Sequence, residues 1–372
     1  IGGALQRPRR ARSARGRPRR APVGARHPGR RAGSGMGADG ADAACAPFAD
    51  RPPFRAAGIA ATGADRLWRR GEAAARGGGM TFPPRLYPDP ASWRGAERKR
   101  VLLFGMSGLG KTHLATMLRE GGDWFHYSVD YRIGTKYMGE FITDSFKREA
   151  MKVPYLRKLL LSASISIESK ISFHNLAPLS TYLGKPGDPA KGGLPIDDYR
   201  KRQAEHREAE IAALLDTPRF IERAEDLYGY PDFVCDSGGS ICEVVDPDDP
   251  ADPVMTTLAG AMLLVWIEGS EAHRRELIRR FDRAPKPMYY PPDFLDACWA
   301  DYLARTGAAG DTVDPDAFVR FTYDKALAHR QPRYAAMARN WGVSITADEA
   351  TSVRDPQGFV DLIARALDRA AG

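Results

Sequence analysis

The sequence predicts a three-layer α/β fold, in which a central, mostly parallel five-stranded sheet is covered by helices and interrupted by helical insertions. Three observations predict it. Five short apolar segments rich in β-favouring residues are separated by helical patterns. A glycine-rich loop joins the first of these segments to an amphipathic helix. With 43% hydrophobic residues, the 372-residue chain can bury a sizeable core, which excludes disorder throughout.

Residues 1–79 form a leader whose composition differs from that of the remaining chain. The leader holds 17 arginines, no lysine and five acidic residues, a net charge of +12; the whole chain carries +8, so the rest carries −4. With few aromatic or branched residues, the leader is expected to be disordered. Three interpretations are open: a basic arm for nucleic acid or an anionic membrane, a transit peptide, or upstream sequence that is not native. The composition change at Met80 favours the last, so nucleic acid is an expected partner only if the leader is native.

The sequence predicts neither a membrane-spanning segment nor disulfide bonds. The longest apolar run, residues 258–267, is half the length that spans a bilayer, and no signal peptide precedes it. Cys45, Cys235, Cys242 and Cys298 have neither a CxxC spacing nor the density of a secreted scaffold. We therefore expect no membrane partner and a cytoplasmic protein with reduced thiols, in which Cys235 and Cys242 pack in the core rather than bind zinc.

The first strand, residues 101–104, runs into a phosphate-binding loop that fits the pattern GxxxxGK[ST]. The loop residues are Gly105, Met106, Ser107, Gly108, Leu109, Gly110, Lys111 and Thr112. Glycines let successive backbone N–H groups point into one concavity, where they bind phosphate oxygens with the help of the next helix terminus. We expect Lys111 to reach the β- and γ-phosphates and Thr112 to coordinate Mg²⁺. The alternative is a fortuitous glycine-rich turn; a GxSxG serine hydrolase elbow is not met.

The second and third strands each end at an aspartate. Residues 124–129 run into Asp130 and Arg132, and residues 232–235 run into Asp236, Gly238 and Gly239. Ligands of open α/β sheets bind at the carboxyl ends of the strands, which places these side chains beside the loop. Asp130 is a candidate base or acceptor ligand, and Asp236 a candidate second anchor for Mg²⁺. An Asp130 that caps the turn after the strand and a plain turn at Asp236 are the structural alternatives.

The last two strands carry a basic helix and a closing helix. Residues 261–267 are the most apolar segment, and Ser270 then begins a helix whose Arg279 and Arg280 can reach over the triphosphate, or can simply be solvated. Residues 343–346 form the fifth strand, followed by a helix with apolar residues at helical spacing. The charged helix over residues 197–215 is expected to be a solvated surface helix, because acidic and basic residues alternate along it.

The chain resembles the P-loop kinases, such as shikimate, gluconate and adenylate kinases. The features that carry the resemblance are, in order along the chain, the loop at residues 105–112, Asp130 with Arg132, residues 236–239 and the arginine-rich helix. The resemblance covers residues 98–150, 230–285 and 340–370. It implies a five-stranded parallel sheet, ATP with Mg²⁺ as cofactors, acceptor contacts from the second and third strands, and an arginine-bearing lid. The chain departs from this pattern in its insertion at residues 152–230 and its larger lid-like insertion at 284–340. The acceptor cannot be inherited from the family, because both insertions lie where it would bind.

The leading functional hypothesis is a cytoplasmic ATP-dependent kinase acting on an unknown small polar acceptor. Its catalytic residues are expected to be Lys111, Asp130, Asp236 and Arg279. Arg280 joins the loop in nucleotide binding, Asp130, Arg132, Gly238 and Gly239 bind the acceptor, and Thr112 and Asp236 hold the metal. The competing hypothesis is an ATPase or nucleotide-dependent switch whose insertions bind a protein partner. The absence of an NKxD segment mildly favours adenine over guanine.

Overall fold

Within residues 81–371, which the computed structural model describes, five strands form one sheet. They are β1 (Arg100–Phe104), β2 (Trp124–Ser128), β3 (Asp232–Asp236), β4 (Leu263–Glu268) and β5 (Gly342–Thr346). All neighbours pair in parallel, in the order β2-β3-β1-β4-β5. The predicted five-stranded α/β architecture is confirmed, and the sheet is wholly parallel. The leader, residues 1–79, lies outside the described residues.

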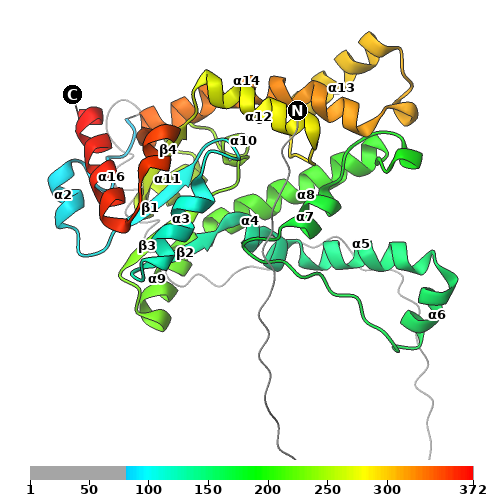
Figure 1. Cartoon of the computed structure of the whole chain (residues 1–372), viewed down its shortest axis with the longest axis horizontal. Coiled ribbons are helices and arrows are strands. Elements are labelled where there is room, and N and C mark those ends of the chain that lie inside the picture. Colours follow the sequence, from blue (N-terminus) through cyan, green and yellow to red (C-terminus); the bar gives the residue numbers. More distant parts are fainter. Residues whose placement is uncertain (1–80, 372) are drawn as a thin grey trace, which may run out of the picture. The chain divides into compact units, whose positions relative to one another are not determined.

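Helices fill the connections between the strands (Figure 1). Before β3 they are α2 (Pro90–Gly95), α3 (Lys111–Glu120), α4 (Val129–Arg132), α5 (Gly139–Met151), α6 (Pro154–Leu161), α7 (Ala177–Leu183), α8 (Ile196–Leu215) and α9 (Thr217–Tyr228). After it come α10 (Ile241–Val244), α11 (Pro253–Ala261), α12 (Glu271–Arg283), α13 (Pro292–Thr306), α14 (Pro315–Trp341), α15 (Ala347–Ser352) and α16 (Pro356–Ala371). The described residues also include the π-helix η1 (Ile133–Tyr137) and the short 3-10 helices η2 (Pro189–Lys191) and η3 (Gly310–Thr312).

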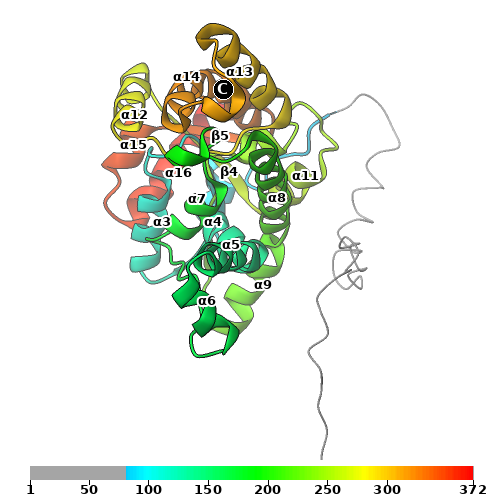
Figure 2. The ribbon, with the colours of Figure 1, turned by 90° about the vertical axis from the view of Figure 1, so that its right-hand side faces the viewer.

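The sheet is the middle of three layers. On one face, α3 packs against β2 and β3, and α16 packs against β5; on the other, α9, α11 and α14 cover the strands. Figure 2 shows α3 and α11 on opposite sides of β4. Because helices cover both faces, the three inner strands β3, β1 and β4 are buried along nearly their whole length, which explains their mostly apolar sequences. The predicted apolar stripe of the closing helix α16 is also buried.

Two sequence-based assignments need correction. The strand predicted over residues 261–267 is present as β4 but begins at Leu263, because Ala261 is the last residue of α11, a helix that was not predicted and that Asp252 caps through the N–H groups of Val254 and Met255. The second correction concerns α8, predicted to be a solvated surface helix. One of its faces is buried against α4, η1, α10 and α11, and that face carries polar as well as apolar side chains. Alternating charges describe only its outer face.

The two expected insertions have different structures. Residues 152–230 supply α6 to α9, of which α9 packs on β2 and β3. Residues 284–340 supply α13 and most of α14, and α14 packs on β4 and β5 as well as on α12. Much of the segment expected to be lid-like is thus part of the layer that covers the sheet. In residues 81–371 there is no helix of sufficient length and apolarity to cross a bilayer.

Candidate nucleotide and acceptor site

The loop between β1 and α3 has a backbone that its three glycines make possible. Gly105, Gly108 and Gly110 have φ angles of 134°, 92° and 97°, in the left-handed region that other residues rarely adopt. A Cβ on Gly105 would also lie 2.7 Å from the carbonyl oxygen of Ile267 in β4, so this residue has no room for a side chain. The chain therefore curls tightly from β1 into the first turn of α3, where free backbone N–H groups favour an anion.

Lys111 lies folded back over this loop. Its Nζ donates hydrogen bonds to the carbonyl oxygens of Gly105 at 2.8 Å and of Met106 at 3.0 Å. The side chain is buried, and burial lowers the pKa of the ammonium, which the carboxylates of Asp236 and Asp130 partly restore. A buried cation held only by backbone carbonyl oxygens can exchange these bonds for stronger ones to phosphate oxygens.

Thr112 and Asp236 meet at the ends of two adjacent elements. Strand β3 pairs beside β1 with Asp236 opposite Leu103, and α3 begins at the end of the loop, so the Thr112 hydroxyl donates to Asp236 Oδ2 at 2.6 Å. Burial raises the pKa of Asp236, against the opposing effects of Lys111 and Thr112. A hydroxyl and a carboxylate are hard oxygen donors, and Mg²⁺ is usually held by one or two carboxylates with waters and substrate phosphates. The two residues fit such an ion.

His126 is a neighbour of Asp236 that sequence reasoning missed. Its side chain is fully buried in β2, its Nε2 lies 3.9 Å from Asp236 Oδ2, and its ring packs on Phe173 at 5.0 Å. Neither ring nitrogen has a hydrogen-bond partner within residues 81–371. Burial lowers the pKa of His126 to about 4, so the ring is neutral near pH 7. A lone histidine in an apolar strand gives no sequence signal beyond core packing.

Asp130 faces the same cleft from the first turn of α4, just past the end of β2. Burial raises its pKa to about 6, and the negative charge of Asp236 adds to this rise while Lys111 opposes it. The cleft has a volume of about 320 Å³. It is lined by Ser107, Gly108, Gly110, Lys111, Thr112, His113, Asp130, Asp236, Ser237 and Gly239. Phosphate-binding, metal-binding and acceptor-binding groups expected from the sequence thus share one cavity at the carboxyl ends of β1, β2 and β3.

The architecture is an α/β fold with a wholly parallel five-stranded sheet, in which the glycine-rich loop follows the central strand β1. No protein-family model and no curated protein matches the sequence. Among solved structures, the chain is similar to a shikimate kinase from Bacteroides thetaiotaomicron, with 17% identity over 73% of this chain and 95% of that chain, and a TM-score of 0.28. The functional assignment below therefore rests on the geometry of the cleft.

Three predicted arginines do not line this cleft. Arg132 donates to Asp216 Oδ2 at 2.8 and 2.6 Å, and Tyr137 donates to the same oxygen, so the guanidinium is tied to the segment before α9. Arg279 and Arg280 are mostly exposed on α12, and both pair with Glu276. Their assignment to the acceptor and to the triphosphate stays a prediction.

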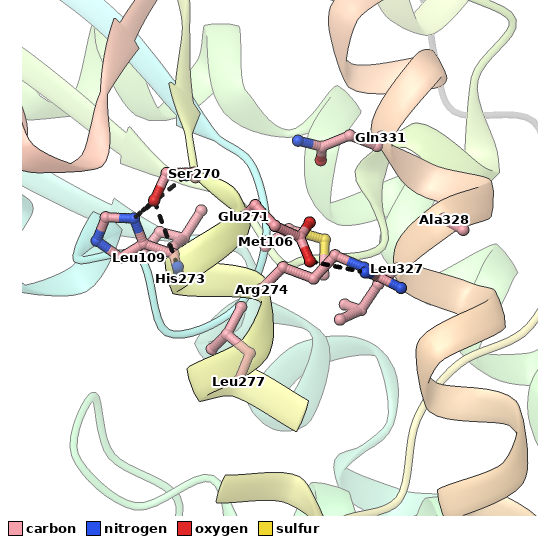
Figure 3. Close-up of a pocket in the computed structure, with 11 residues that line it drawn as sticks. Met106, Leu109, Ser270, Glu271, His273, Arg274, Leu277, Leu327, Ala328 and Gln331 are labelled. Atoms are coloured by element: carbon pink, nitrogen blue, oxygen red, sulfur yellow. Dashed lines mark hydrogen bonds and ion pairs between the residues drawn. The ribbon is translucent and has the colours of Figure 1, made fainter. Parts of the chain in front are cut away.

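A second cavity, of about 290 Å³, lies between the loop residues Met106 and Leu109 and the helices α12 and α14 (Figure 3). The arginine that lines it is Arg274, which pairs with Glu271 and Asp324. Ser270 caps α12 as predicted, because its hydroxyl accepts from the backbone N–H of His273. The basic helix therefore presents its first turns, and not Arg279 or Arg280, to the phosphate loop.

The Gly238–Gly239 turn is held by a buried arginine that the sequence did not reveal. Arg330, in α14, donates to Glu243 Oε1 at 2.8 Å, to the carbonyl oxygen of Gly239 at 3.1 Å and to that of Tyr289 at 2.7 Å. The turn also touches the loop, since a Cβ on Gly239 would lie 2.5 Å from Ser107 Oγ. The segment predicted as a lid thus holds the Gly238–Gly239 turn in place beside the loop.

Glu210, on the buried face of α8, should make stability depend on pH. Burial raises its pKa to about 8, from an ordinary value of 4.5. Between these values the folded chain holds a proton that the unfolded chain has released, so the contribution of Glu210 to stability is lost as pH rises through this window. Gln cannot ionise. We therefore expect the stability of Glu210→Gln relative to wild type, measured as the difference in their unfolding free energies, to be greater at pH 9 than at pH 5. The increase should exceed about 1 kcal/mol.

Urea titrations at both pH values measure this difference. The control is Glu208→Gln, an exposed position of the same helix, for which the relative stability should be the same at the two pH values. A difference for Glu210→Gln that does not change with pH would contradict the raised pKa.

Proposed function

We propose that this chain is a Mg²⁺-dependent phosphotransferase that moves the γ-phosphate of ATP to a small polar acceptor. The observation that carries the proposal is the placement of Lys111, the Thr112–Asp236 pair and Asp130 around one 320 Å³ cleft. Such transfer needs little covalent help from a protein, because positioning and charge stabilisation supply most of the catalysis. A cytoplasmic location is part of the proposal, supported by the buried free thiols Cys235, Cys242 and Cys298.

Each residue has a defined task in this reaction. The loop N–H groups and Lys111 bind the β- and γ-phosphate oxygens, and Lys111 gives up its bonds to the loop carbonyls to do so. Thr112 and Asp236 would hold Mg²⁺, which neutralises charge on the phosphates when bound. Asp130 orients the acceptor hydroxyl and receives its proton, a role that a carboxyl with a pKa of about 6 can perform near neutral pH.

The metal assignment predicts a specific defect in Asp236→Asn. We expect the gain in ATP affinity that Mg²⁺ provides to fall about tenfold, because one charged metal ligand is lost. Affinity for ATP in the presence of a chelator should stay within about threefold of wild type on the same grounds. Calorimetric titrations with Mg²⁺ and with chelator measure both quantities, and Asp226→Asn, at an exposed position of α9, is the control. Equal loss of affinity with and without metal would return Asp236 to the role of a turn residue.

A further inference from the structure

The buried face of α8 carries a cluster of polar side chains that the reaction above does not use. Gln203, His206 and Glu210 follow one another at spacings of three and four residues and are 3%, 6% and 0% exposed. The cluster is completed by Tyr289, whose ring stacks on His206 at 5.3 Å. His206 Nδ1 lies 3.7 Å from Glu210 Oε2, so the side chains are contiguous. We call these four residues the α8 cluster.

Each member of the α8 cluster has a polar atom with no hydrogen-bond partner in the described chain. The atoms are Gln203 Nε2, His206 Nδ1, Glu210 Oε1 and the Tyr289 hydroxyl. In two of these side chains the other polar atom is already hydrogen-bonded. Gln203 Oε1 accepts from the Tyr290 N–H at 2.8 Å, and Glu210 Oε2 accepts from the Ser240 hydroxyl at 2.7 Å. A buried polar group without a partner costs about 1–3 kcal/mol, so four together indicate that a polar ligand completes them.

The α8 cluster comes close to Asp130 on the other side of Gly238. The point where a Cβ on Gly238 would lie is 2.7 Å from Asp130 Oδ1 and 3.4 Å from Glu210 Oε1. Asp130 itself lines the cleft. The carboxyl groups of the candidate base and of the α8 cluster therefore flank the same glycine, with no side chain between them.

The groups that flank this point are two carboxyl groups. Among the described residues, the buried cation that acts on Glu210 is Arg330, which is engaged by Glu243 and by two carbonyl oxygens, one of them that of Tyr289. Lys111 is directed at the loop. A phosphate or carboxylate on the acceptor would thus meet two carboxyl groups, whereas an ammonium would favour release of the Glu210 proton and pair with the resulting carboxylate.

We propose that the α8 cluster binds the acceptor of the proposed phosphotransfer, and that this acceptor is a hydroxyl compound with a protonated amine on the neighbouring carbon. Glu210 pairs with the ammonium, Asp130 accepts a hydrogen bond from the adjacent hydroxyl, and Gln203, His206 and Tyr289 bind further hydroxyl groups. In the transfer, the acceptor oxygen forms a bond to the γ-phosphorus, the bond from that phosphorus to the β–γ bridging oxygen breaks, and ADP leaves. The hydroxyl proton passes to Asp130. The inference rests on the proposed function for the identity of the reaction.

A panel matched in carbon length tests the chemistry of the acceptor. It pairs the amines ethanolamine, serinol and glucosamine with the neutral compounds ethylene glycol, glycerol and glucose, and with the acids glycolate, glycerate and gluconate. Each compound is titrated into the full chain saturated with Mg²⁺ and ADP, and heat is measured. We expect at least one amine to bind about tenfold or more tightly than its neutral and acidic counterparts, as a buried charged hydrogen bond provides.

Two variants test whether a preference for the amine depends on the α8 cluster. Glu210→Gln should lose the preference for the amine while its affinity for Mg²⁺ and ADP stays unchanged, and Glu208→Gln should behave as wild type. Three results would overturn the inference. They are an acid that binds as tightly as its matched amine, the absence of a preferred amine at every carbon length, and a preference that persists in Glu210→Gln. Failure to bind Mg²⁺ and ADP would instead contradict the proposed function, so the two failures are distinguishable.

Discussion

Lys111→Ala should abolish tight binding of Mg²⁺-ATP, lowering the affinity about 100-fold or more. The ammonium is buried within the loop, close to the carbonyl oxygens of Gly105 and Met106, so no water-exposed cation can replace it at the phosphates. Charged hydrogen bonds to phosphate contribute about 1.5–3 kcal/mol each, and Lys111 can make more than one. The fold should survive, because burial already disfavours the charge.

Calorimetry measures the affinity and urea titration measures the stability of this variant. Lys152→Ala is the matched control, since that lysine is exposed at the end of α5, where it pairs with Glu149. Its nucleotide affinity should equal that of wild type. If Lys111→Ala retained wild-type affinity, the loop would be a structural turn and not a nucleotide site.

Asp130→Asn should lower turnover about 100-fold to 10,000-fold while changing Mg²⁺-ATP affinity by less than about threefold. The amide keeps the shape of the side chain but cannot receive the acceptor proton. Asp130 belongs to α4 and not to the phosphate-binding loop, and its Oδ1 lies 2.7 Å from the point where a Cβ on Gly238 would lie. The effect should therefore fall on the chemical step and not on nucleotide binding.

ATP consumption with the pooled panel of amines, polyols and acids measures turnover, and a parallel calorimetric titration measures binding. Asp144→Asn, on the exposed part of α5, is the control and should be unaffected. Wild-type turnover in Asp130→Asn would reassign this carboxyl to capping the turn after β2.

Local sequence signals were sufficient for the sheet and the loop. The strands are short apolar runs, and the loop glycines occupy the conformations that their pattern requires. Helix α11 was missed because its apolar residues run directly into β4. The signal that would have separated the two elements is Asp252 followed by Pro253, a capping residue with proline at the first helical position.

The acceptor side of the site could not be predicted in the same way. Gln203, His206 and Glu210 share one face of α8, but polar residues at helical spacing usually mark a solvated face, and it is packing against α4, η1, α10 and α11 that buries this one. Arg132 and Asp216 are 84 positions apart, so nothing local revealed that this arginine is already paired. Arg330 likewise reaches the Gly239 carbonyl from 91 positions away. Such contacts depend on topology, which spacing does not encode.

The fate of the γ-phosphate tests the central claim most directly. Wild-type chain is incubated with Mg²⁺ and γ-labelled ATP, with and without the pooled panel, and the labelled products are separated by charge and size. We expect label in a small organic phosphate, dependent on Mg²⁺ and on the panel, and absent from Lys111→Ala and Asp130→Asn. Label released only as inorganic phosphate, at a rate that no added compound changes, would contradict a phosphotransferase and favour an ATPase whose insertions bind a protein partner.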